Sequence, residues 1–193
     1  DDIEIGCGAT LMRLALERPV EVDCVTLCAP PERAAESRAA LTQMLQAAQA
    51  CRLRFESLPD GYLPAHWAEA KRLMESLKSL PVPDLVLTHE RDDLHQDHRV
   101  VSELTWNTFR DHLILEYEVP KYDGGLGQPQ VYVPIPQAVA QRKAQLLVAC
   151  HASQRPKHWF SADAFLALMR LRGLECRAPE GYAEAFHARK LIV

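Results

Sequence analysis

Short apolar runs alternate with amphipathic helical segments along the first half of the chain, and this alternation restricts the possible folds more than any other feature. Three short runs have the composition of strands: 20–28, 53–55 and 84–88. The first of them is mostly apolar, which suits a strand that is covered on both faces, as in parallel sheets. Four segments carry apolar residues at helical spacing: 9–17, 32–50, 64–80 and 97–110. Because helices that connect consecutive strands make right-handed crossovers, we predict an α/β fold, a Rossmann-like three-layer sandwich with a mostly parallel sheet.

The second half of the chain continues with less regular segments. We expect strands and a helix in the following ranges: 113–119, 131–135 and 136–152. Ser161 is predicted to be the N-cap of a helix over 162–172, and Gly173 is predicted to be its C-cap. The final run, 186–193, predicts an edge strand. No repeat or linker divides the sequence, so we expect one domain over residues 1–193.

Composition and charge exclude several classes of protein. The chain has 193 residues, 48% hydrophobic and 25% charged, which is typical of a globular domain. A net charge of −4 and scattered Lys and Arg residues argue against nucleic-acid binding. No apolar run reaches the roughly 18 residues that a membrane-spanning helix needs. Six cysteines without Cys-x-x-Cys spacing predict reduced thiols and a cytoplasmic protein. The oligomeric state stays open, a homo-oligomer included.

A polar stretch after the third apolar run has the residue types of a metal or proton-transfer site. Residues 91–98 read Arg-Asp-Asp-Leu-His-Gln-Asp-His, so that His95 and His98 are separated by one helical turn with Asp97 between them. An isolated His-x-x-His is more often a solvated loop, and Asp97 is also a suitable N-cap for the next helix. The start of the chain favours a site, because Asp1 and Asp2 form a second acidic turn. A pocket at both turns would hold two carboxylates and two histidines.

The glycines that follow this first turn allow two interpretations. Residues 4–8, Glu-Ile-Gly-Cys-Gly, resemble the first motif of class I methyltransferases, in which the backbone approaches S-adenosylmethionine (SAM). Thr10 stands where a third glycine is expected, and the run 20–28 ends without a carboxylate for a ribose. In the other interpretation the glycines form a tight turn into the helix over 9–17, and Asp1 and Asp2 carry the function. A metal-free binding module with this fold is a further alternative.

Two motifs in register resemble those of the PIG-L/LmbE-like N-deacetylase family. Residues 1–8, Asp-Asp-Ile-Glu-Ile-Gly-Cys-Gly, are similar to the stretch after His-Pro in the family signature His-Pro-Asp-Asp, and residues 95–98 are similar to its His-x-Asp-His motif. Between them, Arg-Ala-Ala-Glu at 33–36 resembles the family's Arg-x-x-Glu. Leu-Pro-Asp-Gly at 58–61 and Pro-Asp-Leu-Val at 83–86 also fall in the expected order, so the resemblance covers most of residues 1–100.

The resemblance implies zinc-dependent hydrolysis of the N-acetyl group of an amino sugar such as N-acetylglucosamine, or of its glycoside. Asp2 and His98 would bind Zn²⁺, and Asp1 would be the general base. His95 would stabilise the oxyanion or protonate the leaving amine, and Asp97 would orient it. Three protein ligands and one open position are usual for catalytic zinc, and such a metal activates water. Another amide hydrolysed at the same zinc site is an alternative.

The third ligand in the family is the histidine of His-Pro, which would lie two positions before Asp1. We expect the native chain to contain this His-Pro and a first strand ahead of Asp1. Arg33 and Asp92 are candidate substrate-binding residues, Arg33 for a sugar hydroxyl or phosphate and Asp92 because it is close to His95. Other histidines have no partner spacing that suggests a role, namely His89, His112, His151 and His187.

Overall fold

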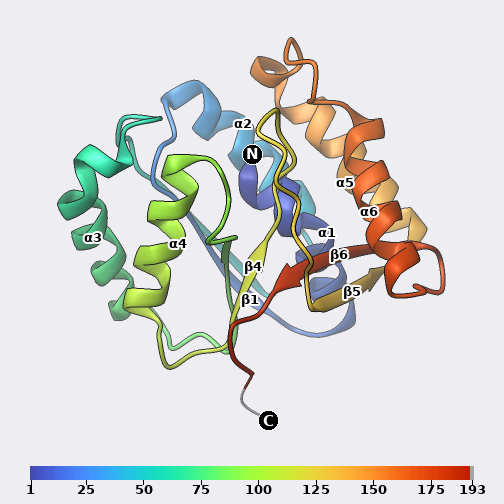
Figure 1. Ribbon diagram of the computed structural model, residues 1–193, viewed down its shortest axis with the longest axis horizontal. Coiled ribbons are helices and arrows are strands. Elements are labelled where there is room, and N and C mark those ends of the chain that lie inside the picture. Colours follow the sequence, from blue (N-terminus) through green and yellow to red (C-terminus); the bar gives the residue numbers. More distant parts are fainter. Residues whose placement is uncertain (192–193) are drawn as a thin grey trace.

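The computed structural model describes residues 1–191 and arranges six strands in two sheets (Figure 1). Helices and strands alternate in the first half: α1 (Asp2–Glu17), β1 (Glu21–Thr26), α2 (Pro31–Met44), β2 (Ala50–Phe55), α3 (Trp67–Ser76), β3 (Val86–His89) and α4 (Gln96–Thr108). The short helical turns η1 (Leu63–His66) and η2 (Leu77–Ser79) flank α3. The second half contains β4 (Ile114–Tyr117), β5 (Val131–Ile135), α5 (Gln137–Cys150), η3 (Ala152–Gln154), α6 (Ala162–Glu175) and β6 (Tyr182–His187).

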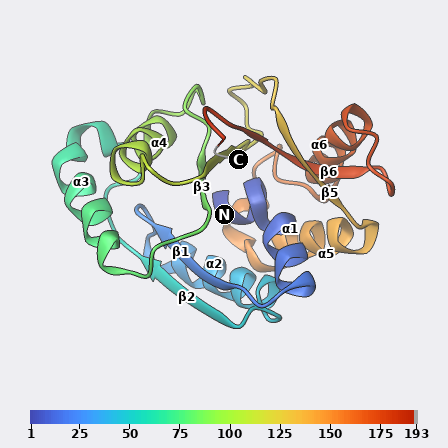
Figure 2. The same ribbon diagram turned by 90° about the horizontal axis from the view of Figure 1, so that it is seen from below.

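Three layers are formed, as predicted. α3 and α4 pack on one side of the strands, and α1, α2, α5 and α6 pack on the other (Figures 1 and 2). Each side has its own hydrophobic core. The larger core includes Leu41, Leu147 and Phe186, and the smaller one includes Leu63 and Leu104. None of the helices within residues 1–191 has both the length and the apolar character needed to span a membrane.

The strands are parallel in the first half of the chain, which confirms the predicted α/β class. β1 pairs in parallel with β2, and β3 pairs in parallel with β4, whereas β6 is antiparallel to both β4 and β5. The prediction of an edge strand over 186–193 is wrong. β6 ends at His187 and lies between β4 and β5. Ala183, Ala185 and Phe186 on this strand are all buried, as is typical of an inner strand. Residues 192–193 lie outside the described part of the chain.

A cavity of about 1210 Å³ separates β1 from β3, and the two sheets do not pair across it. Residues of both strands line its walls, among them Val22 and Cys24 on β1 and Leu87 on β3. Asp1 and Asp2 also line this cavity. The cavity therefore reaches the carboxyl ends of β1 and β3, where functional residues collect in open α/β sheets.

The first helix begins earlier than predicted. The sequence predicts a turn over 1–8, but α1 starts at Asp2 with Asp1 as its N-cap, and both glycines lie inside it. A Cβ at Gly6 would be 2.2 Å from the ring of Tyr117, and one at Gly8 would be 3.1 Å from the sulfur of Met44. The glycines thus allow close packing and do not form a turn. Because this backbone is buried against side chains, the basis for the methyltransferase interpretation is removed.

The ends of α6 show one correct and one wrong prediction. Ser161 is its N-cap, and its hydroxyl accepts a hydrogen bond of 3.2 Å from the amide of Ala164. Gly173, however, is not a C-cap, since the helix continues to Glu175. A Cβ at Gly173 would be 2.2 Å from the carbonyl oxygen of Gly181. The absence of a side chain at this position allows the turn before β6 to approach the helix.

Candidate metal centre and active site

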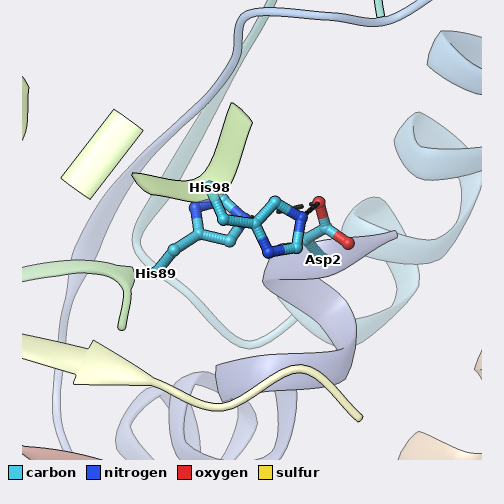
Figure 3. Close-up of side chains that lie close together, drawn as sticks. All are labelled: Asp2, His89 and His98. Atoms are coloured by element: carbon cyan, nitrogen blue, oxygen red, sulfur yellow. Dashed lines mark hydrogen bonds and ion pairs between the residues drawn. The ribbon is translucent and has the colours of Figure 1, made fainter. Parts of the chain in front are cut away.

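Three side chains from separate parts of the chain converge at the cavity (Figure 3). Asp2 comes from the first turn of α1, His89 ends β3, and His98 lies in the first turn of α4. Oδ2 of Asp2 lies 3.3 Å from Nε2 of His89 and 3.2 Å from Nε2 of His98. All three ligand atoms lie within 4.8 Å of one another.

The donor set and its spacing fit a metal ion. Two ligands on a tetrahedral ion with bonds of 2.0–2.1 Å are roughly 3.3 Å apart, which is close to the separations from Asp2 to both rings. The ammonium of Lys121 also lies here, 2.9 Å from Nε2 of His98 and 3.4 Å from Oδ1 of Asp2. The pocket therefore accommodates a positive charge at this point. Asp2, His89 and His98 could together hold a metal ion.

Charges around the cluster keep Asp2 ionised. Burial would raise its pKa, but the charge of Lys121 and the hydrogen bonds from the two histidines outweigh burial and hold this pKa well below its ordinary value. Burial would also lower the pKa of His98, yet its bonds to Asp2 and Asp93 raise it to about 9. The pKa of His89 falls to about 4 because of burial and the nearby positive charge of His98. His89 is therefore already neutral at pH 7.

Asp93 orients His98. Its Oδ2 lies 2.8 Å from Nδ1 of His98, and its Oδ1 accepts a 2.7 Å bond from the amide of His95. Burial would raise the pKa of Asp93, but the bond with His98 lowers it. A carboxylate on the outer nitrogen fixes the tautomer of a metal-binding imidazole and turns its other nitrogen toward the ion. On the other ligand, the hydroxyl of Tyr117 lies 3.4 Å from Nδ1 of His89.

Asp1 is held beside Asp2 by an arginine from α2. Nη2 of Arg33 donates a 2.5 Å bond to Oδ1 of Asp1, and its Nη1 donates a 3.1 Å bond to Asp60. The side chain of Asp1 is only 3% exposed, and Asp1 and Arg33 both line the cavity. A carboxylate that is not among the clustered ligands therefore lies next to them.

His95 and Asp97 lie at the same cavity with different environments. The ring of His95 lies 4.6 Å from that of His98, and its buried Nδ1 has no hydrogen-bond partner within the described residues. Burial and the charges of His98 and Lys121 lower the pKa of His95. Asp97 accepts bonds of 2.6 and 3.0 Å from the amides of Gly61 and Leu63. Asp97 thus anchors the loop before η1.

Two expectations for this stretch need correction or qualification. The alternative in which Asp97 is the N-cap of α4 is wrong, because His95 occupies that position and Asp97 lies inside the first turn. Asp92, a candidate substrate-binding residue, is exposed and is not part of the cavity wall. Arg33, the other candidate, is part of that wall.

Sequence reasoning missed His89 and Asp93. His89 was among the histidines without interpretable spacing, although its position at the end of an apolar strand is a signal for the functional edge of a parallel sheet. Asp93 lies five residues before His98, and only the fold of the loop brings the two side chains together. Lys121 carried no sequence signal, because it lies in an irregular segment between β4 and β5.

The fold and the cluster define a three-layer α/β protein with a candidate metal centre, flanked by a buried carboxylate, at the carboxyl ends of its strands. The sequence model of the PIG-L family, described as GlcNAc-PI de-N-acetylase, matches residues 1–109. Because this range is more than half of the chain, the chain belongs to the PIG-L family. The resemblance predicted from the two motifs is confirmed. De-N-acetylases are hydrolases of amide bonds, and the family thus identifies the chain as an enzyme of this class.

Solved structures with a similar fold agree with this assignment. The conserved protein TT1542 from Thermus thermophilus is 22% identical with a TM-score of 0.76, covering 100% of this chain and 91% of that chain. N,N'-diacetylchitobiose deacetylase from Pyrococcus horikoshii is 19% identical with a TM-score of 0.67, covering 96% and 79%. The A40926 pseudoaglycone deacetylase Dbv21 is 20% identical with a TM-score of 0.70, covering 97% and 92%. At these identities the likeness establishes the fold. No curated protein matches the chain.

Proposed function

We propose that this enzyme hydrolyses the N-acetyl group of an amino sugar, or of a glycoside that carries one, in a zinc-dependent reaction. The products are the free amine and acetate. The observation that carries this proposal is the position of Asp1, held by Arg33 next to the ligand cluster in one cavity. Membership of a de-N-acetylase family supports the same reaction. Neighbours that are named as deacetylases of N,N'-diacetylchitobiose and of the A40926 pseudoaglycone favour an N-acetylated sugar as the substrate class.

Zinc is the metal that best suits this donor set. Two imidazoles and one carboxylate are an established ligand set for catalytic zinc, and they leave one position open. The chemistry that a bound Zn²⁺ supplies is Lewis acidity, which activates water near neutral pH and polarises a carbonyl. A structural neighbour, teicoplanin deacetylase Orf2, is described in a zinc-inhibited form, which supports metal binding in this fold and leaves activation by zinc to the experiment below. The predicted histidine before Asp1 lies outside the sequence and stays a prediction.

The side chains around the cluster have distinct tasks in this proposal. Asp1 takes a proton from the attacking water, and Arg33 keeps its carboxylate at the right place. His95 faces the oxyanion or the leaving amine. Because its pKa is lowered, His95 is a neutral hydrogen-bond donor at pH 7. Asp97 acts through the loop that it anchors, and its predicted contact with His95 stays a prediction.

Substrate would enter where the cavity is lined by Tyr122, Lys157 and Trp159. An indole ring such as that of Trp159 can stack on the apolar face of a sugar. Arg33 remains the candidate for a sugar hydroxyl.

The cellular location of the protein is a separate proposal. All six cysteines are free, which supports a reducing compartment and hence a cytoplasmic location.

The proposal is tested by acetate release from small N-acetylated sugars. Zinc-loaded protein is incubated with N-acetylglucosamine and with N,N'-diacetylchitobiose, and acetate is quantified by an enzyme-coupled assay. We expect turnover that stops when a chelator removes the metal and returns when Zn²⁺ is added. Full activity of the metal-free protein, or no acetate from any N-acetylated sugar tested, would overturn the proposal.

Binding of Zn²⁺ should release one proton at neutral pH and should strengthen as the pH rises. The pKa of His98 in the metal-free protein is about 9, so this ring is protonated at pH 7 and must lose its proton to bind the metal. His89, with a pKa of about 4, releases none. The affinity is therefore expected to rise roughly tenfold per pH unit until the pH approaches the pKa of His98. Calorimetry in buffers of different ionisation enthalpy measures the proton, and an affinity independent of pH would contradict the prediction.

A further inference from the structure

A buried ion pair lies against the middle of α1, away from the candidate metal centre. Nζ of Lys143, on α5, is 2.6 Å from Oε1 of Glu184, on β6, and both side chains are 3% exposed. Burying two charges is costly unless each is paired and hydrogen-bonded. The partners that complete this pair are backbone groups of α1.

Each member of the pair binds the backbone of α1 at a different point. Lys143 donates a 2.5 Å bond to the carbonyl oxygen of Ile5. Glu184 accepts bonds of 3.0 and 2.7 Å from the amides of Ala9 and Thr10. In a regular α-helix these two amides donate to the carbonyls four residues earlier, those of Ile5 and Gly6. The ion pair thus binds backbone groups that belong to the hydrogen-bond ladder of α1, which stays one continuous helix over Asp2–Glu17.

The contacts of the pair fall on either side of Gly6, between the first turn of α1 and the rest of the helix. Lys143 acts as a C-cap for the first turn, which is closed by a 2.9 Å bond from the amide of Ile5 to the carbonyl of Asp1. Glu184 acts as an N-cap for the remainder of the helix. The first turn carries Asp1 and Asp2, so its position is set by side chains from α5 and β6.

Neither charged residue lines the cavity that contains the metal centre. Lys143 and Glu184 line a separate space of about 20 Å³ together with Ile5 and Gly6. Gly6 in turn packs on Tyr117, whose hydroxyl approaches His89. The pair therefore makes its contacts toward the site through backbone and packing. Both residues also lie beyond residue 109, outside the part of the chain that the family model matches.

We propose that Lys143 and Glu184 are positioning residues, which clamp the first turn of α1 so that Asp2 and Asp1 face the metal and the water. This inference rests on the proposed function for the roles of the two aspartates. In this proposal the first turn is held by the hydrogen bonds from the two side chains to the backbone of α1. The attraction between the two charges alone would not hold it. A purely structural ion pair would contribute to folding without affecting metal affinity.

The experiment compares four variants of the full chain: Lys143→Met, Lys143→Arg, Glu184→Gln and the exchanged pair Lys143→Glu/Glu184→Lys. Zinc affinity is measured by competition with a chelator, kcat and KM by acetate release, and folding by circular dichroism. We expect Lys143→Met to weaken zinc binding about 10- to 100-fold, which is the usual effect of losing a residue that holds a metal ligand in place without binding the metal. It should lower kcat with little change in KM. Lys143→Arg keeps a donor for Ile5 and should restore most of the affinity.

The exchanged pair separates capping from charge pairing. It keeps opposite charges, but a glutamate at 143 cannot donate to the Ile5 carbonyl and a lysine at 184 cannot accept from the two amides. Its zinc affinity should therefore be as weak as that of Lys143→Met. Glu184→Gln keeps one side-chain oxygen as an acceptor and should fall between Lys143→Met and the wild type. An exchanged pair with wild-type affinity would overturn the proposal.

Arg172→Met is the matched control. Arg172 forms a buried pair with Glu118 at 2.5 Å, and its other bonds go to Glu175 and the Gly127 carbonyl, none of which belongs to α1. This variant should lose stability and keep its zinc affinity. Equal loss of affinity in Arg172→Met and Lys143→Met, or no loss in a folded Lys143→Met protein, would refute the clamp.

Hydrogen exchange of the metal-free protein adds a readout that does not depend on activity. Amide protection of Ile5, Ala9 and Thr10 should fall in Glu184→Gln and remain in Arg172→Met, and this comparison holds even if Lys143→Met does not fold. Unchanged protection in Glu184→Gln would contradict the clamp. A wild-type protein that binds zinc but releases no acetate would refute the proposed function and leave this inference standing.

Discussion

Replacing Asp1 with asparagine is expected to lower kcat for deacetylation by a factor of about 10² to 10⁴ and to leave one zinc ion bound per chain. The carboxylate of Asp1 lies beside the Asp2, His89 and His98 cluster without belonging to it, so its loss removes the proposed proton acceptor and keeps the candidate metal ligands. An asparagine oxygen can still accept the bond from Arg33, and the local structure should persist. Steady-state acetate release and metal analysis of the same sample measure the two effects.

Asp2→Asn is the matched control for this prediction, because the two residues are adjacent on the same turn. This variant should lose zinc together with activity, since the neutral amide is a poor ligand for the ion. If Asp1→Asn kept wild-type turnover, the role of general base would belong to another residue. If it lost zinc as fully as Asp2→Asn, Asp1 would be a ligand.

His89→Ala is expected to weaken zinc binding by more than about 100-fold, which exceeds the usual effect of losing a residue that only holds a metal ligand in place. The reason is that Nε2 of His89 points at Asp2 at nearly the same distance as Nε2 of His98 does, which makes the two rings equivalent donors. His98→Ala should have a similar effect. Chelator competition at constant pH gives the affinities of both variants.

His95→Ala distinguishes a ligand from a neighbouring histidine. Its ring stacks near His98 but lies outside the Asp2, His89 and His98 cluster, so this variant should keep zinc and lose activity. A His89→Ala protein with wild-type affinity, combined with a His95→Ala protein that loses the metal, would mean that the ligand set has been assigned to the wrong ring.

The alternating elements of the first half could be predicted because their signals are local. The apolar runs that became β1 and β3 and the amphipathic segments that became α2 and α4 carry their periodicity within a few residues. Predictions failed where distant residues decide the outcome. The start of α1 depends on Tyr117 packing on Gly6, and the place of β6 depends on which strands it pairs with.

The same difference between local signals and distant contacts explains which residues of the candidate site could be predicted. Asp1, Asp2 and His98 were found because two short motifs contain them, and the structure brings these motifs together at one cavity. His89 and Asp93 were not found, because a histidine at a strand end and an aspartate in a loop have no distinguishing spacing. The bonds of Asp97 to the amides of Gly61 and Leu63 were equally hidden, since a loop 34 to 36 residues away supplies them.

Asp97 anchors the loop before η1, and this contact connects α4 with the part of the candidate site around Asp1. Asp97 neighbours the candidate ligand His98 on α4 and holds the loop that carries Asp60, while Asp60 shares Arg33 with Asp1. These contacts connect α4, the loop and Asp1 in one series of bonds along the cavity wall. A displacement of α4 would therefore be transmitted through the loop to Arg33, so the positions of His98 and Asp1 are coupled.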